Sequence, residues 1–222
     1  MLDQGVVDPA AVPSISEELE AQGPAAAIAW VVDRFPDRVA LACSFQDCVI
    51  VDLAVKVAPR IPVLFLDTGF HFPETLEFVE LVRERYELNL TITQPAAEAE
   101  LWPCGTARCC ELRKVRPLAS ALAGRRAWIT GLKRVDAPTR AATPVLAWDQ
   151  ARQMLKLNPL AGWTDDDLER YIAEHGLPTH PLMAQGYRSI GCAPTTQPVA
   201  PGADPRSGRW AGTGKTECGL HV

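Results

Sequence analysis

Short apolar segments alternate with longer helical stretches along most of this chain, and that alternation limits the folds open to it. Apolar runs of strand length fall at 39–43, 62–66, 88–93 and 127–131, and further extended segments are expected near 144–148 and 154–157. Apolar residues at helical spacing predict helices over 25–35, 47–57, 74–86, from Cys109 and Cys110 to about Leu122, and from a capping Thr164 to near Gly176. Strands that alternate with helices form a parallel sheet covered on both faces. We therefore expect an α/β fold with a doubly wound, mostly parallel sheet.

The domain organisation follows from length and composition. The 222 residues, 47% of them hydrophobic, suffice for one sizeable core. Residues 1–24, with Pro9, Pro13 and an acidic cluster, are expected to form a loose leader. Residues 25–190 would form the α/β domain, and residues 191–222, which are rich in proline and glycine, would form loops and a flexible tail.

Charge and hydropathy exclude several classes of protein. The net charge of −5 argues against bulk binding of nucleic acid, whereas local basic clusters at 113–140 and at Arg206 and Arg209 indicate a small anionic ligand. No run approaches the roughly 18 apolar residues of a membrane span, and the start lacks the pattern of a secretory signal. We expect a cytoplasmic protein in which the seven cysteines are reduced and serve as metal ligands or redox nucleophiles.

The loops that follow the first two strands are candidate ligand sites, because ligands of doubly wound sheets bind beyond the carboxyl ends of the strands. These loops read Ser44-Phe45-Gln46-Asp47 and Asp67-Thr68-Gly69. The first offers backbone amides, a hydroxyl and a helix start to an anion, although Ser44 or Asp47 could equally be a helix cap. It resembles the Ser-Gly-Gly-x-Asp loop of ATP pyrophosphatases without the glycines, which favours a smaller anion such as a sulfate on an α-phosphate.

The adjacent pair Cys109-Cys110 indicates a polynuclear metal cluster, because two thiolates at one helix start reach such a cluster better than a single zinc ion. The alternative is two reduced core cysteines. Gly191-Cys192-Ala193-Pro194-Thr195 supplies a third thiolate, but Thr195 stands where a Cys-x-x-Cys motif would place the fourth. Cys104 is a substitute that spacing alone does not support. We expect Cys43 and Cys48 to have packing roles.

Cys218 lies close to the last residue of the chain, where a core role is not expected. Gly219 frees the backbone beside it, and the positive character of Lys215 and His221 would favour the thiolate. The sequence therefore predicts a nucleophile on a movable tail, with a reduced cysteine in a frayed tail as the alternative.

Taken together, these motifs resemble the sulfonucleotide reductase family, and within it the thioredoxin-dependent adenylyl-sulfate reductases that act on adenosine 5'-phosphosulfate (APS). The resemblance extends from about Ala25 to Val222 and rests on Cys43-Ser44-Phe45 with Asp47, Leu66-Asp67-Thr68-Gly69, Cys109-Cys110 with Arg113-Lys114-Val115, Trp128 to Lys133, Pro138-Thr139-Arg140, Asn158-Pro159-Leu160, Gly191 to Pro194, Asp204 to Trp210, and Glu217 to His221. It implies a nucleotide-binding domain of the adenine-nucleotide alpha-hydrolase (PP-loop) type over residues 25–190.

The resemblance also implies a chemistry. Cys218 would attack the sulfur of APS, release AMP and hold the sulfonyl group as S-sulfocysteine, which thioredoxin would reduce to free sulfite during sulfate assimilation. Lys114 and His221 would assist catalysis. Residues suited to bind the phosphosulfate or close the tail over it are Ser44, Phe45, Asp47, Asp67, Thr68, Gly69, Arg140, Arg206 and Arg209.

Cys109, Cys110 and Cys192 match three ligands of the family's four-iron four-sulfur (4Fe-4S) cluster, and Thr195 leaves open a labile, incomplete or absent cluster. Three alternatives stay open: a reductase for the 3'-phosphorylated nucleotide (PAPS) with a degenerate or missing cluster, a redox-responsive nucleotide-binding module without turnover, and an ATP-dependent adenylating enzyme, which the missing loop glycines disfavour. A homo-oligomer is also left open.

Overall fold

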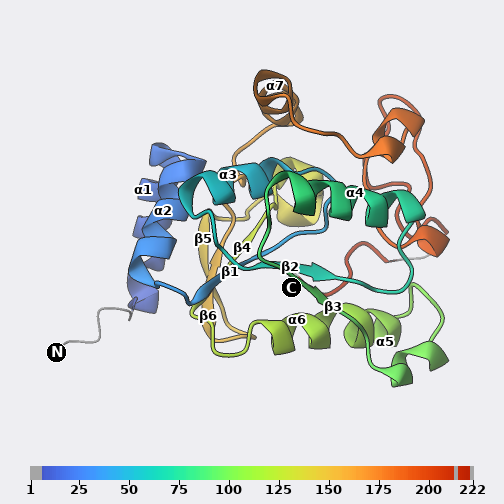
Figure 1. Ribbon diagram of the computed structural model, residues 1–222, viewed down its shortest axis with the longest axis horizontal. Helices are drawn as coiled ribbons and strands as arrows, with labels where there is room; N and C mark the ends of the chain where they lie inside the picture. Colours follow the sequence, from blue (N-terminus) through green and yellow to red (C-terminus); the bar gives the residue numbers. More distant parts are fainter. Residues whose placement is uncertain (1–6, 213–214, 221–222) are drawn as a thin grey trace.

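The computed structural model describes residues 7–212 and 215–220, which form a six-stranded sheet in the order β3-β2-β1-β4-β6-β5 (Figure 1). The strands are β1 (Val39–Ala42), β2 (Val63–Leu66), β3 (Leu90–Thr93), β4 (Ala127–Thr130), β5 (Leu146–Asp149) and β6 (Met154–Leu157). Every neighbouring pair is parallel except β5 and β6, which are antiparallel. The expected α/β fold with a mostly parallel sheet is confirmed.

Helices cover both faces of the sheet, as a parallel sheet requires. The α-helices are α1 (Val12–Gln22), α2 (Pro24–Arg34), α3 (Val49–Val57), α4 (Pro73–Arg85), α5 (Ala107–Cys110), α6 (Arg116–Ala121) and α7 (Asp165–His175). Short 3-10 turns are η1 (Pro9–Ala11), η2 (Ala97–Leu101), η4 (Arg134–Asp136), η5 (Pro138–Arg140), η6 (Pro181–Gln185) and η7 (Ala193–Thr195). In Figure 1, α3 and α4 lie on one side of the sheet, and α5 and α6 lie on the other.

Two apolar clusters hold these layers together. The larger one packs α1, α2, α3 and α4 against one face, with Leu41, Phe65 and Ile129 of the central strands at its centre. The smaller one packs Leu118 and Leu122 against Trp128 on the opposite face. The fold is thus doubly wound around a sheet whose central strands are buried on both sides.

Residues 12–22 correct the expectation of a loose leader. They form α1, which buries Val12 and Leu19 in the larger cluster. The Ser16 hydroxyl accepts a hydrogen bond from the Leu146 backbone nitrogen of β5 (3.0 Å), and Glu20 pairs with Arg134 through both carboxylate oxygens (2.6 and 2.8 Å). The prolines mark helix starts, where no backbone donor is needed, and the acidic residues lie mainly on the exposed face.

Three further boundaries differ from the prediction. α3 begins at Val49 rather than Asp47, because the Asp47 carboxylate accepts a hydrogen bond from the Val49 nitrogen (3.0 Å) and the chain before it is not helical. The basic helix after the cysteine pair is interrupted by a π-helical turn, η3 (Glu111–Val115). The extended piece near 144–148 lies at Leu146–Asp149. The predicted cap of α7 is confirmed, with reciprocal Thr164 and Asp167 hydrogen bonds.

Within the part of the chain that the structure describes, no helix combines the length and apolar character needed to cross a membrane.

Candidate active site

A cavity of about 280 Å³ opens at the point where the strand order changes direction, beyond the carboxyl ends of β1 and β4. Cys43 and Ser44 line it after β1, Thr68 lines it after β2, and Gly131 to Lys133 line it after β4. Cys218 and Leu220 of the tail close another side. This is the position at which doubly wound sheets bind ligands.

The loop after β1 adopts a tight conformation without glycine. Phe45 has a φ of +55°, in the left-handed region that favours glycine, and its fully buried ring packs edge-on against Phe65 at 5.6 Å. The Gln46 side chain accepts a hydrogen bond from the Ile190 nitrogen (2.9 Å) and donates one to the Arg188 carbonyl (3.3 Å). Packing and these hydrogen bonds fix a strained turn that presents Ser44 and Asp47 to the cavity.

Of the three residues predicted in the loop after β2, one lines the cavity and two do not. Thr68 is buried, lines the cavity, and its Oγ1 lies 3.6 Å from the Cys192 Sγ. Asp67 and Gly69 are not part of the cavity wall: the Asp67 carboxylate accepts a hydrogen bond from the Gly69 nitrogen (2.8 Å) and so closes the turn. Gly69 has a φ of +69°, and a Cβ there would lie 3.2 Å from Arg113. These two residues therefore shape the loop that holds Thr68.

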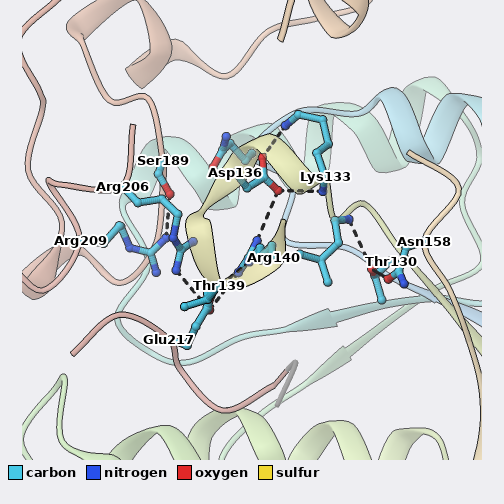
Figure 2. A network of polar contacts seen from close by, with 12 residues as sticks. Thr130, Lys133, Asp136, Thr139, Arg140, Asn158, Ser189, Arg206, Arg209 and Glu217 are labelled. Carbon is cyan, nitrogen blue, oxygen red and sulfur yellow. Dashed lines mark hydrogen bonds and ion pairs between the residues drawn. The ribbon is translucent and has the colours of Figure 1, made fainter. Parts of the chain in front are cut away.

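Arg140, Arg206 and Arg209 come together on one side of the cavity (Figure 2). Arg140 donates to both carboxylate oxygens of Glu217 (2.8 and 2.9 Å), and Arg206 donates to one of them (3.2 Å). The Arg140, Arg206 and Glu217 side chains are only 13%, 13% and 14% exposed, so this is not an ordinary surface ion pair. Arg209 donates to the Ser189 hydroxyl (3.2 Å) and the Ile190 carbonyl (3.1 Å).

The electrostatics of this arginine cluster favour an anion. Burial, and next the positive charge of Arg140, lower the pKa of Arg206. Burial, and next the charge of Arg206, lower the pKa of Arg209. A Cβ on Gly191 would collide with the Arg209 guanidinium, so glycine is required where this side chain crosses the loop. Crowded cations of this kind are stabilised by an oxyanion, which arginine binds through two parallel hydrogen bonds.

Sequence reasoning missed Lys133, Asp136 and Glu217 as site residues. Lys133 follows β4 and pairs with Asp136 (2.6 Å), and Asp136 in turn contacts Arg140 (3.3 Å), as Figure 2 shows. The position of Lys133 and Asp136 after a central strand was a usable signal. Glu217 adjoins Cys218 in sequence, but its arginine partner is 77 residues away. Burial raises the pKa of Asp47, which also lines this part of the cavity.

Lys114 lines the cavity and interacts electrostatically with thiols of the cysteine pair, of the Cys192 loop and of the tail. Burial disfavours its charge, but nearby Cys192, Cys218 and Cys110 outweigh that effect and raise the pKa of Lys114. The Cys218 thiol also interacts electrostatically with Arg206 and Arg209. The predicted nucleophile therefore lies beside three cations in the same cavity as the Ser44 loop.

The tail is docked in this structure. Leu220 packs against the smaller apolar cluster, as Ala42 and Leu66 also do. Lys215, which was expected to act on Cys218, donates a hydrogen bond to the Cys110 Sγ (3.0 Å) and one to the Gly105 carbonyl (3.0 Å). His221 lies outside the described residues.

Among the remaining cysteines, Cys43 and Cys192 line the cavity. Cys109 and Cys110 belong to α5, whose amino terminus is capped by Thr106, and Cys192 lines the cavity. The interaction with the Cys104 thiol lowers the pKa of Cys192 below its ordinary value. Burial opposes this shift, and the positive charge of Lys114 adds to it. Of the two cysteines expected to pack, Cys48 is buried in the larger cluster, and Cys43 lines the cavity and accepts a hydrogen bond from the Phe45 nitrogen (3.3 Å).

The fit of these residues to a metal depends on the kind of metal centre. Among residues 7–212 and 215–220, no three His, Cys, Asp or Glu side chains converge as ligands of a single ion do. An iron-sulfur cluster binds each thiolate at a different iron and so needs wider spacing. Soft sulfur donors flanked by Lys114 and Lys215 suit that chemistry. The donor set fits a cluster better than a single ion.

The fold and the position of the cavity define the chain as an α/β protein of the PP-loop type. Yeast FAD synthetase has the same fold, with a TM-score of 0.61 at 17% identity over 88% of this chain and 71% of that one. A phosphoadenylyl-sulfate (PAPS) reductase from Candida auris in a phosphate complex gives a TM-score of 0.77 at 26% identity, over 86% of this chain and 98% of that one.

Sequence comparison narrows this class. Residues 38–198 match the phosphoadenosine phosphosulfate reductase domain, and the chain belongs to that family. An adenosine 5'-phosphosulfate reductase from Mycolicibacterium smegmatis is 48% identical over 87% of this chain and 86% of its own length. Another from Rhodococcus opacus is 50% identical over 82% and 77%, respectively. The expected family is thereby confirmed.

Proposed function

We propose that this enzyme reduces APS to sulfite and AMP, with thioredoxin as the electron donor, in sulfate assimilation. The observation that carries the proposal is the position of Cys218, which lines the same cavity as the Ser44 loop and lies near Lys114, Arg206 and Arg209. The relatives named APS reductases, at 48% and 50% identity, favour APS over PAPS as substrate.

In the first step, the Cys218 thiolate attacks the sulfur of the sulfate group. A sulfur–sulfur bond forms, and the bond from sulfur to the bridging oxygen breaks, so that AMP leaves with the electron pair. Lys114 and the arginine cluster are placed to offset the negative charge that otherwise repels a thiolate from a sulfate. Cys218 is left as S-sulfocysteine.

In the second step, a thiolate of reduced thioredoxin attacks the Cys218 sulfur and releases sulfite. The second thiol of the donor then resolves the mixed disulfide, which restores the Cys218 thiol and leaves thioredoxin oxidised. The donor supplies the two electrons of the reduction. This step requires the tail to leave the cavity, because Cys218 must meet a protein partner after meeting a nucleotide.

Cys109, Cys110 and Cys192 would hold a 4Fe-4S cluster beside Lys114. When bound, the cluster would supply fixed charge close to the reacting sulfate and would anchor the loops that carry these residues. The residues of the chain itself bind and orient the substrate: Thr68 positions Cys192, and the turn of Phe45 presents Ser44.

The test measures sulfite release with thioredoxin, together with AMP release from APS and adenosine 3',5'-bisphosphate release from PAPS. The chains compared are the parent enzyme, Cys218→Ser and a control, Cys48→Ala, in the packed core. We expect turnover with APS that is at least about tenfold faster than with PAPS, loss of sulfite formation in Cys218→Ser, and retained AMP binding in that variant. Faster turnover of PAPS would make the protein a PAPS reductase. Nucleotide binding without turnover by the parent would make it a binding module.

A further inference from the structure

The motif that supplies Cys192 lacks its second cysteine, and Thr195 occupies that place. A hydroxyl is a poor ligand for iron in a cluster, which selects soft thiolate donors. Three thiolates from Cys109, Cys110 and Cys192 leave one iron of a 4Fe-4S cluster without a cysteine ligand. The structure shows what lies next to Thr195.

Cys104 lies directly beside Thr195. Its Sγ is 3.8 Å from the Thr195 Oγ1, and the Thr195 hydroxyl in turn donates a hydrogen bond to the Cys192 carbonyl (3.4 Å). Gly105 has a φ of +93°, and a Cβ on it would lie 3.0 Å from the Thr195 methyl group. The two segments therefore approach closely, and the Cys104 thiol lies beside Thr195, where the Cys-x-x-Cys motif would have its second cysteine.

The Cys104 segment is also tied to the cysteine pair. The Thr106 hydroxyl donates to the Pro103 carbonyl (3.0 Å) and accepts from the Cys109 nitrogen (3.2 Å), so one residue closes the turn and caps α5. Lys215 bridges the Gly105 carbonyl and the Cys110 Sγ at 3.0 Å each. The segments that carry the four cysteines are therefore held together by defined contacts.

We propose that Cys104 replaces the missing fourth thiolate, so that Cys104, Cys109, Cys110 and Cys192 hold the cluster. The inference rests on the cluster included in the proposed function, but it concerns the ligand set alone. Each thiol loses its proton when it binds iron, and the nearby Lys114 and Lys215 offset the resulting negative charge. On this account, a thiol at 104 and a thiol at 195 are interchangeable.

The test compares the full-length enzyme with Cys104→Ser, Cys104→Ala, Thr195→Cys and the double variant Cys104→Ser/Thr195→Cys. Each is reconstituted anaerobically with iron and sulfide, and the readouts are iron and sulfide per chain and visible absorption. We expect about four irons per chain in the parent, less than half of that in both Cys104 single variants, and recovery in the double variant. Cys48→Ala, in the packed core, is the matched control, and far-ultraviolet circular dichroism checks folding.

Full iron content and an unchanged spectrum in Cys104→Ser and Cys104→Ala would overturn the inference. It would also be overturned if the parent bound no cluster while Thr195→Cys did, or if folded Cys104→Ser/Thr195→Cys failed to recover iron. Sulfite release from APS is measured separately. Loss of iron in the Cys104 variants together with no turnover by the parent would leave the ligand set standing and refute the proposed function.

Discussion

Lys114 interacts electrostatically with both the cluster-side thiols and the tail thiol. Its pKa reflects Cys192 and Cys110 on the one hand and Cys218 on the other, and its side chain lines the cavity. In the proposed reaction, a charge fixed in that position would act on the sulfate while Cys218 attacks it, and it would need no reorganisation. Its contribution should therefore be to rate more than to nucleotide affinity.

Replacement of Lys114 by alanine tests this role. We expect kcat/KM for APS to fall by roughly 10²–10³, the usual cost of removing one such electrostatic donor, with a much smaller change in the affinity for AMP. The control is Lys56→Ala on α3, where Lys56 pairs with Asp52 near the surface. Steady-state rates and AMP binding are measured for both variants. An equal loss in AMP affinity and in kcat/KM would assign Lys114 to ground-state binding instead.

Several site residues could be predicted from the sequence, and their positions show why others could not. Ser44, Asp47 and Thr68 follow the carboxyl ends of β1 and β2 and line the cavity, so order along the chain is enough to find them. Asp67 and Gly69 occupy an equivalent place, but they close the turn, a role that depends on local hydrogen bonding. The Phe45 turn shows that a missing glycine does not by itself exclude a left-handed conformation when packing fixes it.

The tail forms an element whose docking depends on Glu217. Burial opposes ionisation of this carboxyl, but its hydrogen bonds and charge interaction with Arg140, and the nearby Arg206, lower its pKa below the ordinary 4.5. An acid with a lowered pKa stabilises the docked state fully above its ordinary pKa, and this stabilisation is lost as the pH falls through the lowered value. Docking should therefore be strongest at neutral pH and weaken in acid.

Glu217→Gln removes the charge and keeps the shape of this side chain. We expect faster hydrogen exchange in the peptide that contains residues 215–220 at neutral pH, because two arginines lose their carboxylate partner. After correction for intrinsic rates, the difference from the parent should shrink in acid, where the parent carboxyl is protonated. The exposed Glu18 of α1 provides the control variant, Glu18→Gln. Equal protection of the tail in parent and Glu217→Gln at neutral pH would refute the proposed role of Glu217.

At the scale of the whole molecule, His180 couples the stability of the fold to pH. It is 1% exposed, its Nδ1 accepts a hydrogen bond from the Leu182 nitrogen (3.2 Å), and its Nε2 lies 3.0 Å from the Thr75 hydroxyl of α4. Burial lowers the pKa of His180 to about 4, against the opposing charge of Glu74. The unfolded chain binds this proton near the ordinary 6.5, so stability falls as the pH drops from 6.5 towards 4.

A shift of that size is worth roughly 3 kcal/mol in the free energy of unfolding. We expect denaturant unfolding of the parent to show this loss between neutral pH and pH 4, and His180→Gln to have lower stability at neutral pH but a shallower dependence on pH. Because the other titrating groups are common to both chains, their contribution cancels in the difference between the two pH curves. Parallel curves for parent and variant would show that His180 does not carry the pH dependence.

The order of elements was largely predictable, because buried parallel strands and amphipathic helices leave strong periodic patterns. α1 was not predicted: its proline and acidic residues resemble a leader, and only the contacts of Leu19 and Ser16 with the sheet show that it belongs to the core. The same limit applies to the site. Glu217 with Arg140 and Cys104 with Thr195 are pairs made by folding across 77 and 91 residues, which local spacing does not reveal.

The central claim is that Cys218 carries the sulfonyl group between nucleotide and thioredoxin, and its most direct test is a mass measurement on the enzyme mixed with APS in the absence of thioredoxin. The account predicts one AMP released per active site, a mass gain of one SO₃ group on the peptide that contains Cys218, and loss of that mass with release of sulfite when reduced thioredoxin is added. Sulfite formation without this adduct, or an adduct on another cysteine, would contradict it.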